Sequence, residues 1–189
     1  MKHLMMAVVL ACILSTPLAA QEATAITPAQ QELMEAAYLG QLEEVERLVS
    51  AGTAVDFADP EQRTPLMVAA FNGHTPVIGF LVEKGAKLDV RDSNGRTALM
   101  YASSGPFEEA VAYLLEQGAA VNAQGTLEGF TALMTAASEG LLEVVRLLLA
   151  NGADPSVVDE DGDTAASFAR QNGHAEVLAL LENLPAPSQ

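Results

Sequence analysis

The sequence predicts an all-α solenoid of about five helix-turn-helix repeats joined by β-turn or hairpin loops. This prediction rests on three series of residues that share a period of 33 or 34 residues. A threonine that precedes an apolar segment recurs at Thr64, Thr97, Thr131 and Thr164. One glycine series comprises Gly52, Gly85, Gly118 and Gly152, and a second comprises Gly40, Gly73, Gly140 and Gly173, with Pro106 in the slot between its second and third members. Three series with one period indicate that a single structural unit is repeated along the chain.

The first 20 residues are typical of a secretory signal peptide. Lys2 supplies a positive charge, residues 4–14 form an uninterrupted apolar run, and cleavage is expected after Ala20. These apolar residues are too few to span a membrane, which requires about 20. We therefore expect a periplasmic or secreted protein with no stable membrane insertion after cleavage. The alternative is a lipoprotein that is anchored through Cys12.

Removal of the signal peptide would leave a strongly acidic chain without cysteine. Because Cys12 is the only cysteine, the mature chain would form no disulfide and no thiolate metal site. Eight basic residues would then face 25 acidic residues, a net charge of −17. Such a chain lacks the basic surface that phosphate groups require, which argues against nucleic acid as a partner.

The second repeat illustrates how each unit is expected to fold. Thr64 can cap the first helix with its hydroxyl, and Pro65 suits the first helical position, where its missing N–H costs nothing. The Asn-Gly pair at 72–73 is expected to end that helix. A second helix is predicted over residues 76–84, where apolar residues recur with helical spacing, and Gly85 follows it. The polar segment that leads to the next threonine is typical of a turn or an open hairpin.

These units resemble the ankyrin repeat family, whose 33-residue unit carries the signature Thr-Pro-Leu-His-x-Ala. The resemblance is carried by residues 63–67, 96–100 and 130–134, by the Gly-His turns at 73–74 and 173–174, and by Gly-Ala-Asp at 152–154. It covers residues 31–184, with repeats expected at about 31–61, 62–94, 95–129, 130–161 and 162–184. Residues 21–30 are expected to form a polar leader and residues 185–189 a proline-rich tail.

Several positions depart from the family signature. Methionine stands where the family has histidine, so the family's Thr–His hydrogen bond is not expected here; these residues are Met67, Met100 and Met134. The third repeat interrupts the turn between its helices at residues 104–107, and the loop at 124–130 has one extra residue. The first repeat lacks the Thr-Pro-Leu signature and the fifth degrades it, as expected of terminal repeats whose outer faces meet water.

No catalytic or metal-binding constellation emerges from the sequence. His74 and His174 occupy equivalent turn positions, so we expect them to cap turns rather than to catalyse. The acidic segment Asp159–Asp163 lacks the glycine and glutamate spacing of a calcium loop and is expected to be a hairpin tip with at most weak cation binding. No nucleophile or phosphate-binding motif occurs. We therefore expect no enzymatic activity, no cofactor and no structural metal.

The resemblance implies a protein-binding surface on the concave side, formed by the hairpin tips and the exposed side of each first helix. The residues expected on this surface are Tyr38, Arg63, Phe71, Arg96, Tyr101, Leu127 and Phe130. The register places the first and third of them in one column, and both arginines directly before a capping threonine. Local packing between repeats is the alternative role for the aromatic residues.

Three functions are compatible with these features. The leading hypothesis is a monomeric accessory or stabilising factor that binds another exported protein. The second is an immunity or inhibitor protein that neutralises a basic toxin or enzyme in the periplasm, because a charge of −17 would steer a basic partner towards it. The third is a divalent-cation buffer or a hydrolase without a recognisable motif.

Overall fold

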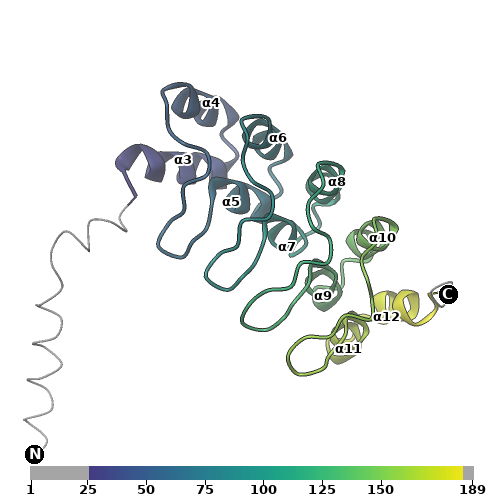
Figure 1. Cartoon of the computed structure of the whole chain (residues 1–189). Helices are drawn as coiled ribbons and strands as arrows, with labels where there is room; N and C mark the ends of the chain where they lie inside the picture. Colours follow the sequence, from purple (N-terminus) through teal and green to yellow (C-terminus); the bar gives the residue numbers. More distant parts are fainter. Residues whose placement is uncertain (1–25, 185–189) are drawn as a thin grey trace, which may run out of the picture.

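The predicted all-α solenoid is confirmed. The computed structural model describes residues 26–184, and these contain ten helices and no strand. The helices form antiparallel pairs that stack side by side in chain order (Figure 1). The inner layer comprises α3 (Pro28–Leu39), α5 (Pro65–Phe71), α7 (Ala98–Ala102), α9 (Ala132–Ser138) and α11 (Ala165–Gln171). The outer layer comprises α4 (Leu42–Ser50), α6 (Thr75–Glu83), α8 (Glu108–Glu116), α10 (Leu142–Ala150) and α12 (Ala175–Glu182).

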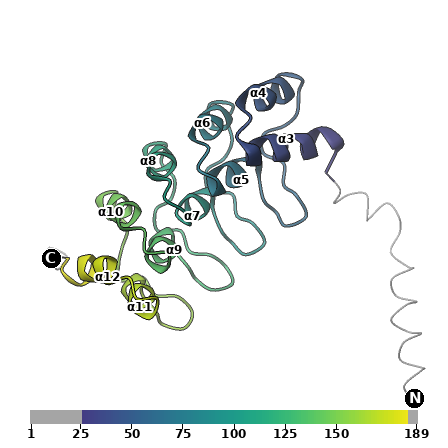
Figure 2. The ribbon, with the colours of Figure 1, turned by 180° about the vertical axis from the view of Figure 1, so that it is seen from behind.

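Four long loops connect the repeats and project from the same edge of the stack, below the inner helices in Figure 1 and again in the reverse view of Figure 2. They span residues 51–64, 84–97, 117–131 and 151–164. The expected signal peptide (residues 1–20) and the proline-rich tail (185–189) lie outside the described residues. The loops and the inner helices together form the surface that the sequence assigned to partner binding.

The capping threonines begin the inner helices as predicted. The hydroxyl of Thr64 accepts a hydrogen bond from the backbone N–H of Met67 (3.4 Å), and Pro65 occupies the first turn. The thioether sulfur of Met67 in turn accepts a hydrogen bond from the backbone N–H of Thr64 (3.4 Å), which makes the cap reciprocal. Each such cap stabilises its helix by about 1 kcal/mol. The hydroxyl cap recurs at Thr27, Thr97, Thr131 and Thr164, and a reciprocal contact from the third helical residue also occurs at Thr27 and Thr164.

The two histidines make structural contacts, but across repeats and not as caps of their own turns. The ring Nε2 of His74 donates to the carbonyl oxygen of Tyr38 (2.9 Å), which lies in the preceding repeat. His174 makes the equivalent bond to the carbonyl oxygen of Ser138 (2.9 Å). Both histidines therefore tie the end of one inner helix to the turn of the next repeat. Gly40 ends helix α3 beside His74 with a left-handed φ of 70°. A Cβ at this position would lie 2.5 Å from the His74 ring, so the contact requires glycine.

Small and branched apolar residues fill the core between the two layers. The inner helices contribute pairs of buried alanines, such as Ala69 and Ala70, which allow neighbouring helices to approach closely. The largest fully buried side chains are Leu33, Val45, Leu66, Met67, Val77, Ile78, Leu81, Leu99, Leu114, Leu133, Met134 and Leu148. The first four repeats contribute to this list, and the fifth adds buried Ala165, Ala169, Val177 and Leu181 to the same cluster, so the stack has one continuous core.

Two helix boundaries differ from those predicted from the sequence. The first helix begins at Pro28, inside the segment expected to be a polar leader, because Thr27 and Gln30 form a reciprocal capping box (2.8 and 3.3 Å). The second helix of the second repeat spans Thr75–Glu83, one residue earlier than expected, since the chain turns into the helix immediately after His74. The predicted interruption of the third repeat is confirmed, because α7 has only five residues.

Candidate protein-binding face

We use the term concave face for the surface formed by the tips of the four long loops and the exposed side of the inner helices. The loop tips form a connected row, because each of them is joined to the next by a backbone hydrogen bond of 2.9–3.1 Å. The donor–acceptor pairs are Ser93 N–H to Glu61 O, Thr126 N–H to Asn94 O, and Glu160 N–H to Glu128 O. This row fixes the side chains of neighbouring repeats relative to one another before any partner binds.

Two arginines predicted for the concave face are paired within their own loops. The carboxylate of Asp59 accepts the backbone N–H of Arg63 (2.7 Å) and its guanidinium (2.7 Å). Asp92 accepts the equivalent bonds from Arg96 at 2.7 and 2.9 Å. Both aspartates are almost completely buried, whereas the arginine side chains remain 42% and 47% exposed. Arg63 and Arg96 therefore hold the loop tips in shape and still present part of each guanidinium to the solvent.

Tyr101 connects the second of these pairs to the inner helix α7. Its hydroxyl donates to Asp92 (2.7 Å) and accepts from Arg96 (2.7 Å), while the guanidinium carbon lies 4.6 Å from the centre of its ring. Burial, together with the hydrogen bond to the carboxylate, raises the pKa of Tyr101 to about 12. Burial alone would raise the pKa of Asp92, but the hydrogen bonds from the Arg96 backbone, Tyr101 and the guanidinium outweigh it and lower that pKa.

Three predicted residues present apolar surface on the concave side. Tyr38 is 49% exposed, Phe71 is 45% exposed and Leu127 is 60% exposed. The ring of Phe71 meets the ring of Tyr101 edge to face, with the centroids 6.0 Å apart. The side chain of Asn72 donates to the carbonyl oxygen of Tyr38 (2.8 Å), which shows that the two repeats lie side by side at this column.

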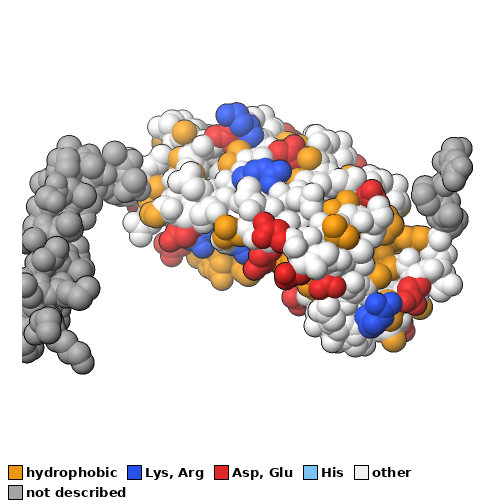
Figure 3. Space-filling view, turned by 60° about the horizontal axis from the view of Figure 1, so that its bottom comes forward, with side chains coloured by type: hydrophobic (Ala, Val, Ile, Leu, Met, Phe, Trp, Pro, Cys, Tyr) orange, Lys and Arg blue, Asp and Glu red, His pale blue; other side chains and the backbone are white. Residues whose placement is uncertain are grey.

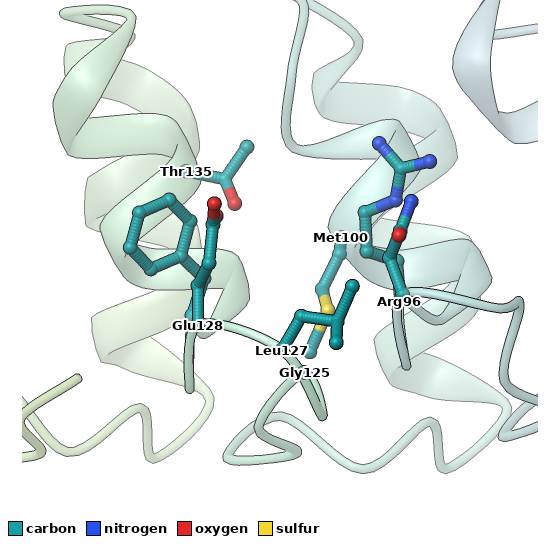
Figure 4. Close-up of a pocket in the computed structure, with 8 residues that line it drawn as sticks. Arg96, Met100, Gly125, Leu127, Glu128 and Thr135 are labelled. Carbon is teal, nitrogen blue, oxygen red and sulfur yellow. The ribbon is translucent and has the colours of Figure 1, made fainter. Parts of the chain in front are cut away.

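A cavity of about 270 Å³ lies between the second and third loop tips, and residues of the longer third loop line it. Figure 4 shows Leu127 beside Met100 in the middle of this cavity, with Arg96 on one side and Glu128 on the other. Phe130 and Thr135 complete the wall on the side of the fourth repeat. The cavity thus combines an apolar floor with one basic and one acidic edge.

A second cavity, of about 260 Å³, lies between the third and fourth loop tips. Phe130 and Phe168 meet edge to face in its wall, with the ring centroids 5.0 Å apart. Acidic side chains form its rim, and Figure 3 shows such acidic groups beside hydrophobic ones on the surface that carries the loop tips. The acidic residues that line it are Glu128, Asp159, Glu160, Asp161 and Asp163.

The structure brings most of the predicted residues together. Phe71, Tyr101 and Arg96 form one contiguous group, and Arg96 also reaches the first cavity, which Leu127 and Phe130 line. The aromatic residues divide between the two roles considered for them, surface contact and local packing. Phe71 is nearly half exposed, whereas Phe130 and Tyr101 are partly buried against the core. Tyr38 and Arg63 lie at the N-terminal end of the face, outside both cavities.

Sequence reasoning missed Phe168 and Met100. Phe168 follows its capping threonine by four residues, as Tyr101 does, and this spacing was a usable signal. Met100 departs from the family signature and also lines the first cavity. Among residues 26–184, no group of three or more His, Cys, Asp or Glu side chains is arranged to hold a metal ion. None of the helices in this range is long and apolar enough to cross a membrane.

A solenoid of paired helices with a row of linked loop tips defines a class of proteins that bind other proteins through an extended surface. Family comparison agrees with this geometry. A family described as ankyrin repeats in three copies matches residues 33–125, and one described as ankyrin repeats in many copies matches residues 114–169. The chain belongs to the ankyrin repeat family. Proteins of this family act in general as non-catalytic modules for protein–protein interaction.

Individual relatives share only parts of the chain. The ankyrin repeat protein nuc-2 of Neurospora crassa is 44% identical over 55 residues, which are 29% of this chain and 5% of the relative. The espin-like protein of Homo sapiens is 39% identical over 59 residues, or 31% of this chain and 6% of the relative. Ankyrin repeat family A protein 2 of Homo sapiens is 47% identical over 47 residues, or 25% and 15%. The chain therefore spans at most 15% of the length of these relatives.

Proposed function

We propose that this protein is an exported, non-catalytic binding module that engages another protein through its concave face and acts as an accessory or stabilising factor. The observation that carries the proposal is the set of exposed apolar side chains on a preformed surface. About half of the surface of Tyr38 and of Phe71, and more than half of that of Leu127, is in contact with solvent. The hydrophobic core residues of the same repeats are buried. Exposed aromatic and arginine side chains on a rigid surface are the residue types that most often dominate binding energy.

A capture experiment with paired variants tests this proposal. The full chain, tagged and expressed in its own cells, is compared with Phe71→Ala on the concave face and with Phe80→Ala on the outer helix α6. Phe80 is the matched control because it is a partly buried phenylalanine of the same solenoid, with Lys84 over its ring (5.2 Å). We expect Phe71→Ala to weaken the recovered complex by roughly 30-fold, which corresponds to about 2 kcal/mol.

Phe80→Ala is expected to retain the partner, because its side chain lies in the outer layer. Loss of the partner with both variants, or with Phe80→Ala alone, would place the binding surface elsewhere and refute the proposal. Far-UV circular dichroism of each variant confirms that the fraction used for capture is folded.

The second candidate function is inhibition of a basic toxin or enzyme. Its support is the distribution of charge, because the last loop carries five acidic residues and no basic residue within positions 152–163. An acidic surface of this kind accelerates association with a basic partner, and salt weakens that acceleration. If the captured partner is a basic enzyme whose activity falls at stoichiometric amounts of this chain, inhibition replaces the accessory role.

Export is part of the proposal and rests on the pattern of residues 1–20. N-terminal sequencing of the protein isolated from its cells is expected to begin near Gln21. A chain that retains Met1 would refute export, and a lipid-modified Cys12 would replace a soluble exported protein with an anchored one.

A further inference from the structure

The second and fourth long loops, each with the inner helix that follows it, carry equivalent residues at three positions, with one exchange of charge. In the second loop and α7 these positions hold Asp92, Arg96 and Tyr101. Two repeat periods later, 67 residues further on in each case, the fourth loop and α11 hold Asp159, Asp163 and Phe168. The aspartate and the aromatic ring are thus kept, whereas an acidic residue stands in the place of the arginine.

The backbone around both aspartates is the same. One carboxylate oxygen of Asp92 accepts the backbone N–H groups two and four residues later, at 2.9 and 2.7 Å. One oxygen of Asp159 accepts the corresponding groups from Asp161 and Asp163, at 3.0 and 2.7 Å. Both carboxylates are therefore fixed by their own turns in the same orientation relative to the inner helix that follows.

The second carboxylate oxygen distinguishes Asp92 from Asp159. In Asp92 this oxygen accepts from the guanidinium of Arg96 (2.9 Å) and from the hydroxyl of Tyr101 (2.7 Å). In Asp159 the second oxygen has no hydrogen-bond or ion-pair partner among residues 26–184, although the residue is only 9% exposed. This oxygen is not among the buried polar atoms without a partner, so it reaches the solvent at the cavity. An accessible carboxylate oxygen without a cation can accept a charge-assisted hydrogen bond from a positive partner.

Asp159 lines the second cavity, and the other walls suit the same kind of ligand. Phe168 stands where Tyr101 stacks against a guanidinium, and Phe130 widens the aromatic wall. Asp163 adds a second carboxylate, whose only hydrogen bond from the described residues comes from Gln171 (3.2 Å). The residues that line this cavity include no lysine and no arginine. An aromatic surface bounded by carboxylates attracts a planar cation both electrostatically and through its ring.

We propose that this cavity is a socket for an arginine side chain of the protein partner. The inserted guanidinium takes the place that Arg96 occupies in the third repeat, stacks on Phe168, and pairs with Asp159 and Asp163. Arginine fits better than lysine because its planar group can stack and can donate two parallel hydrogen bonds. The inference rests on the proposed function, since it assigns one contact to the concave face, and it adds the chemistry of the residue that the partner must supply.

Titration with small probes tests the socket without the partner. The isotope-labelled full mature chain is titrated with acetyl-arginine methylamide, and in parallel with the corresponding lysine and citrulline derivatives, while amide resonances are followed by NMR. We expect saturable shifts at residues 159–163 and at Phe168 with the arginine probe. The citrulline probe, which has nearly the same shape but no charge, is expected to bind at least tenfold more weakly, and the lysine probe is expected to bind more weakly than arginine. Equal shifts with all three probes, or shifts elsewhere only, would overturn the proposal.

Asp163→Arg supplies the missing arginine from within the chain. By analogy with Arg96, this variant is expected to lose the response to the arginine probe and to raise the melting temperature by about 2–4 °C. Glu46→Arg on the outer helix α4 changes the net charge by the same amount far from the cavity, and it is expected to keep the probe response. If Asp163→Arg binds the probe like the unaltered chain, the proposal fails.

Asp159→Asn provides a second test that does not depend on the new arginine. The amide oxygen can still accept the two backbone N–H groups, so the turn should persist while the negative charge is lost. Probe affinity is expected to fall at least tenfold, and an unchanged affinity would overturn the proposal. The socket and the proposed function fail separately: a partner lost through Phe71→Ala without any probe response refutes the socket alone, whereas a probe response with capture insensitive to Phe71→Ala refutes the proposed function alone.

Discussion

Removal of the Tyr101 hydroxyl is expected to destabilise the third repeat measurably. Tyr101→Phe keeps the ring against Phe71 and beneath the guanidinium, so the packing is preserved. It deletes two hydrogen bonds of 2.7 Å, one donated to Asp92 and one accepted from Arg96. The variant therefore isolates the polar part of this network from its apolar part.

The magnitude follows from what the remaining groups can still satisfy. Hydrogen bonds to charged groups contribute about 1.5–3 kcal/mol each to stability. Because the Arg96 guanidinium continues to pair with Asp92, the loss should lie at the lower end, at about 1.5–2 kcal/mol of unfolding free energy. For a chain of this size such a change lowers the melting temperature by about 4–6 °C. Urea unfolding followed by circular dichroism measures the free energy directly.

The contribution of this network to stability is expected to fall in both acid and alkali. The pKa of Asp92 is lowered in the folded state, so its contribution is present above the unfolded pKa and is lost as the pH falls through the folded one. The difference between Tyr101→Phe and the unaltered chain should therefore shrink in acid. The pKa of Tyr101 is raised to about 12, so its contribution is lost as the pH rises from 10 towards 12, and the variant should lack this alkaline loss.

Ultraviolet titration of the phenols provides the independent readout. One of the three tyrosines should ionise with a pKa of about 12, and that transition should disappear in Tyr101→Phe. A variant with unchanged unfolding free energy, or a titration in which the alkaline transition persists, would refute the network described for Asp92, Arg96 and Tyr101.

Three further predictions concern the core, the aromatic residues and the charge. Ser103→Ala should stabilise the fold by about 1 kcal/mol in urea unfolding, because the buried Ser103 hydroxyl has no partner among the described residues and the equivalent positions hold Ala70 and Ala137; a loss of stability would contradict this. Phe130→Ala should cost about 2–4 kcal/mol of unfolding free energy and Phe71→Ala about 1–2, because Phe71 is already 45% exposed; the reverse order would refute the burial assigned to them. The melting temperature should be insensitive to EDTA and should rise with moderate NaCl, which screens the repulsion among acidic groups; a substantial fall with EDTA would indicate a metal site.

Most of the fold could be predicted from the sequence because the residues that begin and end the helices recur every 33 or 34 positions. The spacing of Thr64 and its equivalents gave the starts of the inner helices, and the glycines that follow gave their ends. The boundaries that differed depend on local geometry. The capping box of Thr27 and Gln30 lies before the first complete repeat, where no period pointed to it.

The candidate site was predictable in its position and less so in its chemistry. Register alone placed Arg63 and Arg96 on the concave face, but only the structure pairs each of them with a buried aspartate at hydrogen-bonding distance. The cavities could not be derived from a period, because they depend on how neighbouring loop tips approach one another. Asp163 stood in the arginine slot of the sequence, yet its significance becomes clear only beside the unpartnered oxygen of Asp159.

The central claim is that the concave face is the surface that contacts the partner. Site-specific photo-crosslinking tests it most directly, with p-benzoylphenylalanine placed at Leu127 on the third loop or at Glu83 at the end of the outer helix α6. Both positions are exposed, so neither substitution should disturb the core. Irradiation of cells that express the full chain is expected to give a discrete crosslinked species from position 127 and none from position 83. Crosslinking from position 83 alone, or equally from both positions, would contradict the account.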